Sequence, residues 1–352
     1  MIIEMLYNII SAVDAAEKML CEVPTSMKKT HIDQVDNAVS AVAAKPSVNH
    51  FYFTACGGSM AFLQPAVYIL SKELVIPASL YTANEFCHAV PKALNENSVF
   101  ISCSHSGNTP ETVKATEIAR AAGATTISFS HLEGSPLWNA CEYPIHYDWR
   151  DEAPDASDLN NGVLYRLIFG LLNAISPCSK FQRGIRAVDS IDTVLNRVKA
   201  ANADWAKEYG RAFKRENLIY SMGSGSCAGE CYSFSACLMM EMQWIHSAYI
   251  HSGEYFHGPF EITDDDVPFV LVKNTGSERP LDERAHAFCQ KYSQKIALVD
   301  VDSFDMTGID EDLREYFAPI FAGAVLRQLA DALAYERGHQ LSVRRYMWQM
   351  EY

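Results

Sequence analysis

The sequence lacks the features that mark several protein classes. Its formal net charge is −14, and no stretch provides the basic stripe that a nucleic-acid surface needs. The longest apolar run without a charge, near Tyr316 to Leu326, is well short of the ~18 residues of a membrane-spanning helix. The first residues, "MIIEMLYNII", have no basic segment like that of a signal peptide. We therefore expect a cytoplasmic protein that binds neither nucleic acid nor a membrane.

The cysteines follow no disulfide or metal-binding pattern. They form no CxxC pair, and no histidine stands near them at zinc-site spacing. Several lie within apolar segments, and a reducing compartment keeps such thiols free. We predict free, mostly buried thiols at all ten positions: Cys21, Cys56, Cys87, Cys103, Cys141, Cys178, Cys227, Cys231, Cys237 and Cys289.

The sequence does contain a regular alternation of strands and helices. With 49% hydrophobic and 20% charged residues, its 352 residues suffice for two domains or one large one. The segments "FYFTACG" (51–57), "VFISC" (99–103) and "TTISFS" (125–130) are typical of buried strands and are separated by helical patterns. The alternation restarts at "LIYSMGSGS" (218–226) and continues through "VPFVLVKN" and "KIALVDVD". This order predicts an α/β fold with parallel sheets and flanking helices.

The two halves resemble each other, which indicates an internal duplication. "FYFTACGGSMA" (51–61) and "LIYSMGSGSCA" (218–228) each read as a strand, a glycine turn with serine, and a helix. The polar stretch "DEAPDASDLNN" interrupts the pattern between them. We predict an N-terminal helical segment at 1–34, a first domain at 35–155, a helical linker at 156–200, a second domain at 201–308, and a C-terminal helix and tail at 309–352.

The loop "SHSGNTPET" (104–112) joins a predicted strand to a predicted helix. Thr109 is placed as the helix N-cap, Pro110 as the first helical residue and Glu111 in the first turn. A helix N-terminus with free N–H groups and small hydroxyl side chains around it suits an anion. The loop therefore predicts a phosphate site.

A second loop, 56–59, follows a strand in the same half of the chain. Open α/β sheets bind ligands at the carboxyl ends of their strands, so the two loops together could surround one phosphate. Neither loop is a GxxxxGK[ST] or a GxGxxG motif, and we do not expect a nucleotide. The alternative is that both are solvated connections with helix caps.

Glu241 is a candidate proton-transferring base. At helical spacing its neighbours are Cys237, Leu238, Trp244 and Ile245, all apolar, and no opposite charge lies within helical reach. Such surroundings raise the pKa of a carboxyl group toward neutral pH, as a general base requires. The alternative is a structural glutamate bonded to backbone or to a partner subunit.

His257 is a candidate catalytic histidine because it precedes a Gly258–Pro259 turn that could project its imidazole into a cleft. His246, His251 and Glu254 crowd the same segment, but their spacing fits no helical zinc motif. We therefore expect no metal ion.

In combination these motifs resemble the SIS fold, which binds phosphosugars. The pattern consists of "CGGS" at 56–59, "SHSGNTPET", and Glu241 followed by "HGP" at 257–259. It is similar to the isomerase half of glucosamine-6-phosphate synthase and more similar to the deglycases of phosphorylated Amadori compounds. "MEMQWIHSAYIHSGEYFHGPFEITD" (240–264) and the ending "RRYMWQMEY" resemble the branch that acts on 6-phosphofructose-aspartate. The resemblance covers almost the whole chain and implies two tandem SIS domains, each a flavodoxin-like parallel sheet with flanking helices.

The resemblance also implies roles for individual residues. Glu241 falls on the catalytic base, and His257 on a histidine that comes from the neighbouring subunit and assists ring opening or acts as general acid. A homodimer with shared active sites follows from this. His105 stands where the synthase-like pattern has glutamine. The implied phosphosugar-binding residues are Gly58, Ser59, Ser104, His105, Ser106 and Thr109.

The resemblance implies a cofactor-free deglycase that releases glucose 6-phosphate and a free amino acid. The synthase ends in a tail with a lysine that works on the sugar, whereas Met347 to Tyr352 contain none, which favours the deglycase branch. Two alternatives stay open: a phosphosugar aldose–ketose isomerase and a non-catalytic sugar-phosphate sensor. The missing basic surface and the short N-terminal segment speak against the sensor.

Overall fold

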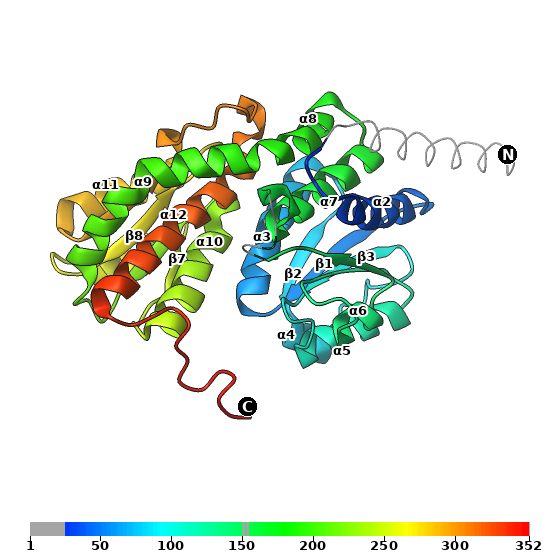
Figure 1. Cartoon of the computed structure of the whole chain (residues 1–352), viewed down its shortest axis with the longest axis horizontal. Helices are drawn as coiled ribbons and strands as arrows, with labels where there is room; N and C mark the ends of the chain where they lie inside the picture. The colour runs from blue at the N-terminus through cyan, green and yellow to red at the C-terminus, as the bar shows by residue number, and fades with distance from the viewer. Residues whose placement is uncertain (1–24, 150–151, 153–154, 352) are drawn as a thin grey trace, which may run out of the picture. The chain divides into compact units, whose positions relative to one another are not determined.

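The chain folds into two compact units, Met1–Asp192 and Thr193–Tyr352, in a computed structural model. The structure describes residues 25–149, 152 and 155–351, so most of the predicted N-terminal helical segment and Cys21 lie outside the described residues. The nine cysteines within the described residues are all free. Each unit is built around its own parallel sheet (Figure 1).

The first unit contains a five-stranded parallel sheet with strand order β2-β1-β3-β4-β5. The three central strands are almost entirely buried, as expected for parallel strands covered on both faces. The strands are β1 (His50–Ala55), β2 (Ala78–Thr82), β3 (Ser98–Cys103), β4 (Thr125–Ser130) and β5 (Tyr143–His146).

Helices cover both faces of this sheet: α2, α3 and α7 lie on one side, and α4, α5 and α6 on the other (Figure 1). The helix α7 is buried along most of its length and packs on α2 and α3, so this part of the predicted 156–200 linker is a core helix of the first unit. The helices are α2 (Lys29–Ala43), α3 (Gly57–Glu73), α4 (Ala83–His88), α5 (Pro110–Ala121), α6 (Pro136–Ala140), η2 (Ala156–Asp158), α7 (Asn160–Ile175), α8 (Ser179–Ala187) and η3 (Val188–Ser190).

The second unit contains a four-stranded parallel sheet with strand order β7-β6-β8-β9. Its strands are β6 (Tyr220–Gly223), β7 (Tyr249–His251), β8 (Phe269–Lys273) and β9 (Ile296–Asp300). Its helical segments are α9 (Ile191–Phe213), η4 (Gly225–Cys227), α10 (Ala228–Ser233), η5 (Phe234–Met242), η6 (Pro259–Ile262), α11 (Arg279–Tyr292), η7 (Val301–Ser303), η8 (Glu311–Leu313) and α12 (Arg314–Arg337), of which α9 begins in the first unit.

The helix α12 forms the core of the second unit and runs beside α9 (Figure 1). The two backbones approach closely at Gly210, where a Cβ atom would lie 2.6 Å from the Ala332 carbonyl oxygen. Among the described residues, Glu311–Arg337 is the one helical stretch long and apolar enough to cross a membrane, and 67% of its most apolar window is buried inside the protein. Its apolar composition is explained by this packing.

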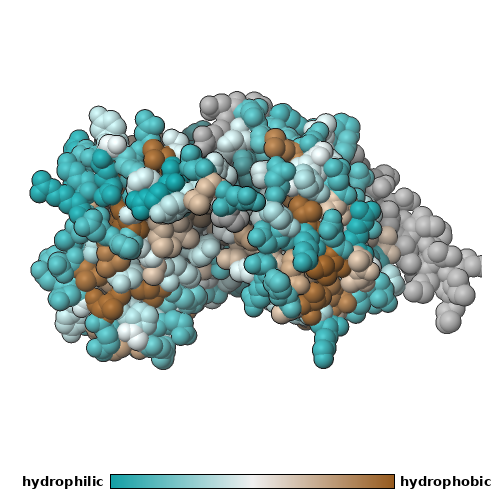
Figure 2. Space-filling view, turned by 90° about the horizontal axis from the view of Figure 1, so that it is seen from below, coloured by the Kyte–Doolittle hydropathy of each residue, from teal (hydrophilic) through white to brown (hydrophobic). Residues whose placement is uncertain are grey.

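The surface is mostly hydrophilic and is interrupted by hydrophobic patches on the face drawn in Figure 2. Four exposed large apolar residues occur within a short stretch near the C-terminus: Val343, Tyr346, Trp348 and Met350. Exposed apolar clusters of this kind are typical of surfaces that contact another molecule.

Candidate active site

Two loops leave the carboxyl ends of the adjacent strands β1 and β3, whose last residues, Ala55 and Cys103, pair in register. After β1, α3 begins at Gly57, which has a positive φ of 54° and so favours glycine. Gly58 is exposed and Ser59 half-buried in the first turn of α3. The structure thus brings the two predicted phosphate loops to the same edge of one sheet.

The second loop has the cap that the sequence predicts. Thr109 is the N-cap of α5 and Pro110 is its first residue. The Ser104 and Thr109 hydroxyls lie 2.9 Å apart and hydrogen-bond, and Ser106 is exposed, with its hydroxyl accepting from the Asn108 N–H at 3.2 Å. Gly107 has φ 66°, and a Cβ there would lie 2.0 Å from the Ser135 hydroxyl oxygen. Glycine is therefore required at this turn.

The buried thiol of Cys103 connects the two loops. Burial raises its pKa to about 12, although hydrogen bonds with the Ser59 and Tyr147 hydroxyls act in the opposite direction. Ser59 of the first loop therefore contacts the strand that leads directly into Ser104. Two helix N-termini with hydroxyl side chains at their first turns form an arrangement that suits a phosphate group.

His105 is held by an aromatic cluster that the sequence did not reveal. Its Nδ1 atom lies 3.0 Å from the Tyr147 hydroxyl, and its ring stacks on His131 with centroids 5.2 Å apart. The centre of the Trp149 ring lies 4.5 Å from the centre of the His105 ring. His131 directly follows β4, whereas Tyr147 and Trp149 follow β5, a short edge strand absent from the predicted pattern.

Glu241 lies in a helix of unusual geometry. From Phe234 to Met242 the chain is a π-helix, so the α-helical spacing from which its neighbours were predicted does not apply. Trp244 lies beyond the helix end with φ 56°, where it is exposed, whereas Cys237 is buried. π-Helical turns occur frequently at functional sites.

The Glu241 carboxylate has a cationic partner that lies far along the chain. Its Oε1 atom is 2.8 Å from Nη2 of Arg344, a side chain that is only 7% exposed. Arg344 also donates to the carbonyl oxygens of Leu341 and Val343 at 2.7 and 2.9 Å. Burial raises the pKa of Glu241, and Arg344 acts against this rise without cancelling it. The predicted direction of the pKa shift is confirmed, although the absence of a charged neighbour holds only within the helix.

Glu241 lines a pocket of about 790 Å³ within the second unit. The Arg345 guanidinium lies 4.2 Å from the centre of the Trp244 ring, so the pocket presents two cations, Arg344 and Arg345. The lining residues are Ala236, Met240, Glu241, Trp244, Ile245, His246, Arg344, Arg345, Tyr346 and Met347.

His257 does not lie with these residues in the described chain. It is exposed in the turn before η6, and its backbone N–H donates to the Glu254 carbonyl at 2.9 Å. His246, whose place in the sequence is more typical of a core histidine, is exposed and lines the pocket instead.

Comparisons with known proteins identify the family of this chain. The SIS domain model matches residues 47–165. Fructosamine deglycase FrlB of Bacillus subtilis (strain 168) is 47% identical over 307 residues, which cover 87% of this chain and 93% of the relative. The chain belongs to the SIS domain family. The prediction of two tandem SIS domains, each a parallel sheet with flanking helices, is confirmed.

Two further similar proteins match this chain over more than nine-tenths of its length. Fructoselysine 6-phosphate deglycase of Escherichia coli (strain K12) is 25% identical over 330 residues, or 94% of each chain. A solved structure from Bacillus subtilis, a phosphosugar isomerase candidate, is 45% identical with a TM-score of 0.87 and covers 92% of this chain and all of its own. The relatives thus include both deglycases and an isomerase candidate.

Proposed function

We propose that this SIS-family protein is a deglycase that cleaves 6-phosphofructose-aspartate to glucose 6-phosphate and aspartate. The observation that carries the proposal is Glu241: a carboxylate with a raised pKa, in a pocket that also presents Arg344 and Arg345. The names of two relatives, a fructosamine deglycase and a fructoselysine 6-phosphate deglycase, support the reaction class.

In this proposal the 6-phosphate is bound by the loops 56–59 and 104–109. The Ser106 hydroxyl and one hydroxyl of the hydrogen-bonded Ser104–Thr109 pair would donate hydrogen bonds to it, with the N-terminus of α5 stabilising the negative charge. Gly58 and Ser59 would supply the first turn of α3, and His105 would border the site.

The proposed chemistry is proton transfer at C1 and C2 of the open-chain sugar. Glu241 removes a C1 proton next to the C2 carbonyl while an acid protonates the carbonyl oxygen, which gives an enaminol. Reprotonation at C2 turns the C1–N bond into an imine. Water then hydrolyses the imine to the aldehyde of glucose 6-phosphate and the free amine, so the atoms balance without a cofactor.

The pocket cations favour an acidic amino acid as the second half of the substrate. Arg344 is engaged by Glu241, whereas Arg345 contacts the Trp244 ring and has guanidinium donors that suit a carboxylate. A lysine adduct would place an ammonium group among these cations. Aspartate, with two carboxylates, therefore fits the charge of the pocket better.

We also propose a cytoplasmic homodimer in which His257 of a second subunit acts at the Glu241 pocket, in ring opening or as general acid. The exposure of His257 and its separation from the pocket within one chain support this arrangement. The apolar side chains Tyr346, Trp348 and Met350 offer surface for such a contact.

The test is a coupled assay with glucose-6-phosphate dehydrogenase on three substrates: 6-phosphofructose-aspartate, the corresponding lysine adduct, and fructose 6-phosphate. We expect glucose 6-phosphate and stoichiometric aspartate from the first substrate alone. Conversion of fructose 6-phosphate alone would replace the deglycase with an isomerase, the alternative suggested by the isomerase candidate among the relatives. Binding of fructose 6-phosphate without any turnover would favour the sensor.

A further inference from the structure

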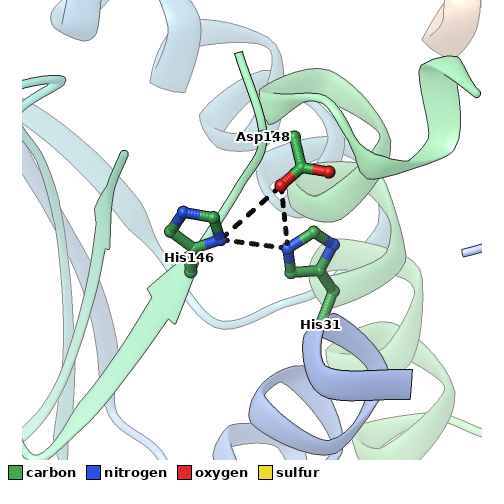
Figure 3. Close-up of side chains that lie close together, drawn as sticks. All are labelled: His31, His146 and Asp148. Carbon is green, nitrogen blue, oxygen red and sulfur yellow. Dashed lines mark hydrogen bonds and ion pairs between the residues drawn. The ribbon is translucent and has the colours of Figure 1, made fainter. Parts of the chain in front are cut away.

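The first unit contains a cluster of polar side chains that includes none of the residues proposed to bind phosphate or to transfer protons. His31 of α2, His146 at the end of β5 and Asp148 just beyond it point toward one another (Figure 3). His31 and Asp148 are buried, with 2% and 5% of their surface exposed. The proposed deglycase chemistry gives these residues no task.

The geometry of the three side chains is that of a set of metal ligands. The Nε2 atom of His31 lies 3.1 Å from Nδ1 of His146, and the Oδ1 atom of Asp148 lies 3.9 and 4.0 Å from these two nitrogens. A point equidistant from the three atoms lies about 2.1 Å from each, which is the usual length of a bond between Zn²⁺ and an imidazole nitrogen. We propose that His31, His146 and Asp148 bind one divalent transition-metal ion, Zn²⁺ by the chemistry of the ligands, with water completing the coordination.

A hydrogen bond alone does not account for this arrangement. One proton can join the two ring nitrogens, but it leaves Asp148 Oδ1 beyond hydrogen-bond length from both. The other carboxylate oxygen, Oδ2, is already paired with the Lys28 ammonium. Oδ1 is therefore the oxygen turned toward the gap between the two histidines.

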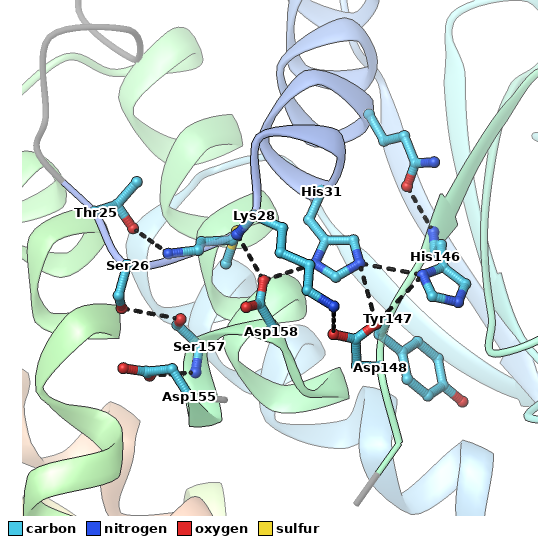
Figure 4. Close-up of polar contacts among 12 residues, drawn as sticks. Thr25, Ser26, Lys28, His31, His146, Tyr147, Asp148, Asp155, Ser157 and Asp158 are labelled. Carbon is cyan, nitrogen blue, oxygen red and sulfur yellow. Dashed lines mark hydrogen bonds and ion pairs between the residues drawn. The ribbon is translucent and has the colours of Figure 1, made fainter. Parts of the chain in front are cut away.

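Asp158 supplies the orienting contact that metal-bound histidines usually have. Its Oδ1 atom lies 2.8 Å from Nδ1 of His31, which donates to it, so the proton is fixed on Nδ1 and the Nε2 lone pair faces His146. The same oxygen accepts the Lys28 backbone N–H at 2.7 Å. Figure 4 shows this contact within a chain of polar bonds from Thr25 to His146. The start of α2 is thereby held in place before any ion binds.

Charge also favours a cation. With neutral imidazoles, the cluster holds the Lys28 ammonium and the carboxylates of Asp148 and Asp158, which leaves one negative charge uncompensated. A cation bound by the two rings and Asp148 would compensate this charge.

The ion would have a structural task. His31 of α2 and His146 of β5 are 115 residues apart in the sequence, and an ion would join them directly. An ion that binds the folded chain and not the unfolded one raises the melting temperature with its concentration. This inference goes beyond the proposed deglycase activity and does not depend on it.

The test is metal binding by the full-length protein. The purified chain is stripped with a chelator, dialysed against Zn²⁺ or Co²⁺, and assayed for bound metal by mass spectrometry and for the visible absorption of bound Co²⁺. We expect one ion per chain and a Co²⁺ spectrum with low-coordinate nitrogen and oxygen ligands. A chain that retains neither ion stoichiometrically overturns the proposal.

Substitutions in the cluster test whether the ion binds there. We expect His146→Ala, at the edge of the sheet, to weaken binding at least tenfold, and Asp158→Asn to weaken it by about 10- to 100-fold through the lost orientation of His31. His88→Ala, which changes an exposed histidine of the same unit, is the matched control. Zn²⁺ should raise the melting temperature of the parent and of His88→Ala but not of His146→Ala. Equal metal binding by His146→Ala and the parent overturns the assignment, and none of these readouts depends on turnover.

Discussion

In the first unit, the glycine–serine turn after β1 leaves Gly58 exposed and Ser59 half-buried, whereas the corresponding turn after β6 in the second unit is buried. There, the Ser224 hydroxyl donates to Asp282 at 2.8 Å, and the Ser226 hydroxyl donates to the Glu315 carbonyl at 2.7 Å. The hydroxyls of the second unit are thus already engaged by the protein.

The difference shows how one local pattern serves two purposes. Both turns join a parallel strand to a helix, as the internal duplication predicts. A serine hydroxyl has one proton, however, and Ser224 and Ser226 donate theirs inside the protein, so neither has a proton left for an anionic ligand. Asp282 takes the place of an anion in the second unit, because it accepts from Ser224 and, at 2.9 Å, from the Asn274 backbone N–H. The second unit contains Glu241 instead, so we propose a division of tasks in which the first unit binds phosphate and the second transfers protons.

The strongest test of this division is Glu241→Gln. General acid–base transfer contributes about 10²–10⁴-fold, and we expect kcat to fall by that factor because the amide cannot accept the C1 proton. The affinity for inorganic phosphate, measured by calorimetry, should stay within twofold of the parent. Near-normal turnover would remove Glu241 from the chemistry, whereas lost phosphate affinity would show that the two tasks are not separate.

The second-largest expected effect is on the stability of the folded protein. Asp282→Ala leaves the buried Ser224 hydroxyl and Asn274 N–H without their acceptor, and we expect a loss of about 2–5 kcal/mol in the free energy of unfolding. Urea titration followed by circular dichroism measures it. Glu283→Ala, which alters the next and half-exposed residue of α11, should change stability by less than about 0.5 kcal/mol. A small effect of Asp282→Ala would mean that the buried turn does not need its carboxylate.

Ser106→Ala should give the reverse result in the first unit. Its hydroxyl is exposed, so stability should change by less than about 0.5 kcal/mol. A hydrogen bond to a charged group contributes about 1.5–3 kcal/mol, and we expect KM for the phosphorylated substrate to rise roughly 10- to 100-fold with kcat little changed. Steady-state kinetics beside a melting curve checks both. An unchanged KM would leave the loop as a solvated connection, the alternative stated from the sequence.

Local features of these regions could be predicted from sequence, and distant partners could not. The strand at 125–130 and the Thr109–Pro110 cap are found where the pattern placed them, because both depend on neighbouring residues alone. The ion pair of Glu241 with Arg344 and the bond of Ser224 with Asp282 join segments far apart in the chain, and no periodicity reveals them.

Two other differences have local causes that the patterns did not capture. The π-helix at Phe234–Met242 changes which residues are neighbours of Glu241 although the sequence there is compatible with an α-helix. The strand β5 contains Pro144, which is tolerated because β5 is at the sheet edge, and β7 spans only three residues. Such short edge strands carry too little pattern to be recognised.

The smallest expected effect concerns the pH dependence of the second unit. Glu241 must be ionised to accept a proton, so kcat/KM should fall as the pH drops through its pKa, which burial places above the usual value for glutamate. Arg344 lowers that pKa, so Arg344→Ala should move the acidic limb of the kcat/KM profile to higher pH. Arg345→Ala is the matched control, because Arg345 lies over Trp244 and is expected to leave the limb in place while weakening substrate binding. If both variants shift the limb equally, the effect comes from the net charge of the pocket; if neither does, the limb belongs to a group other than Glu241.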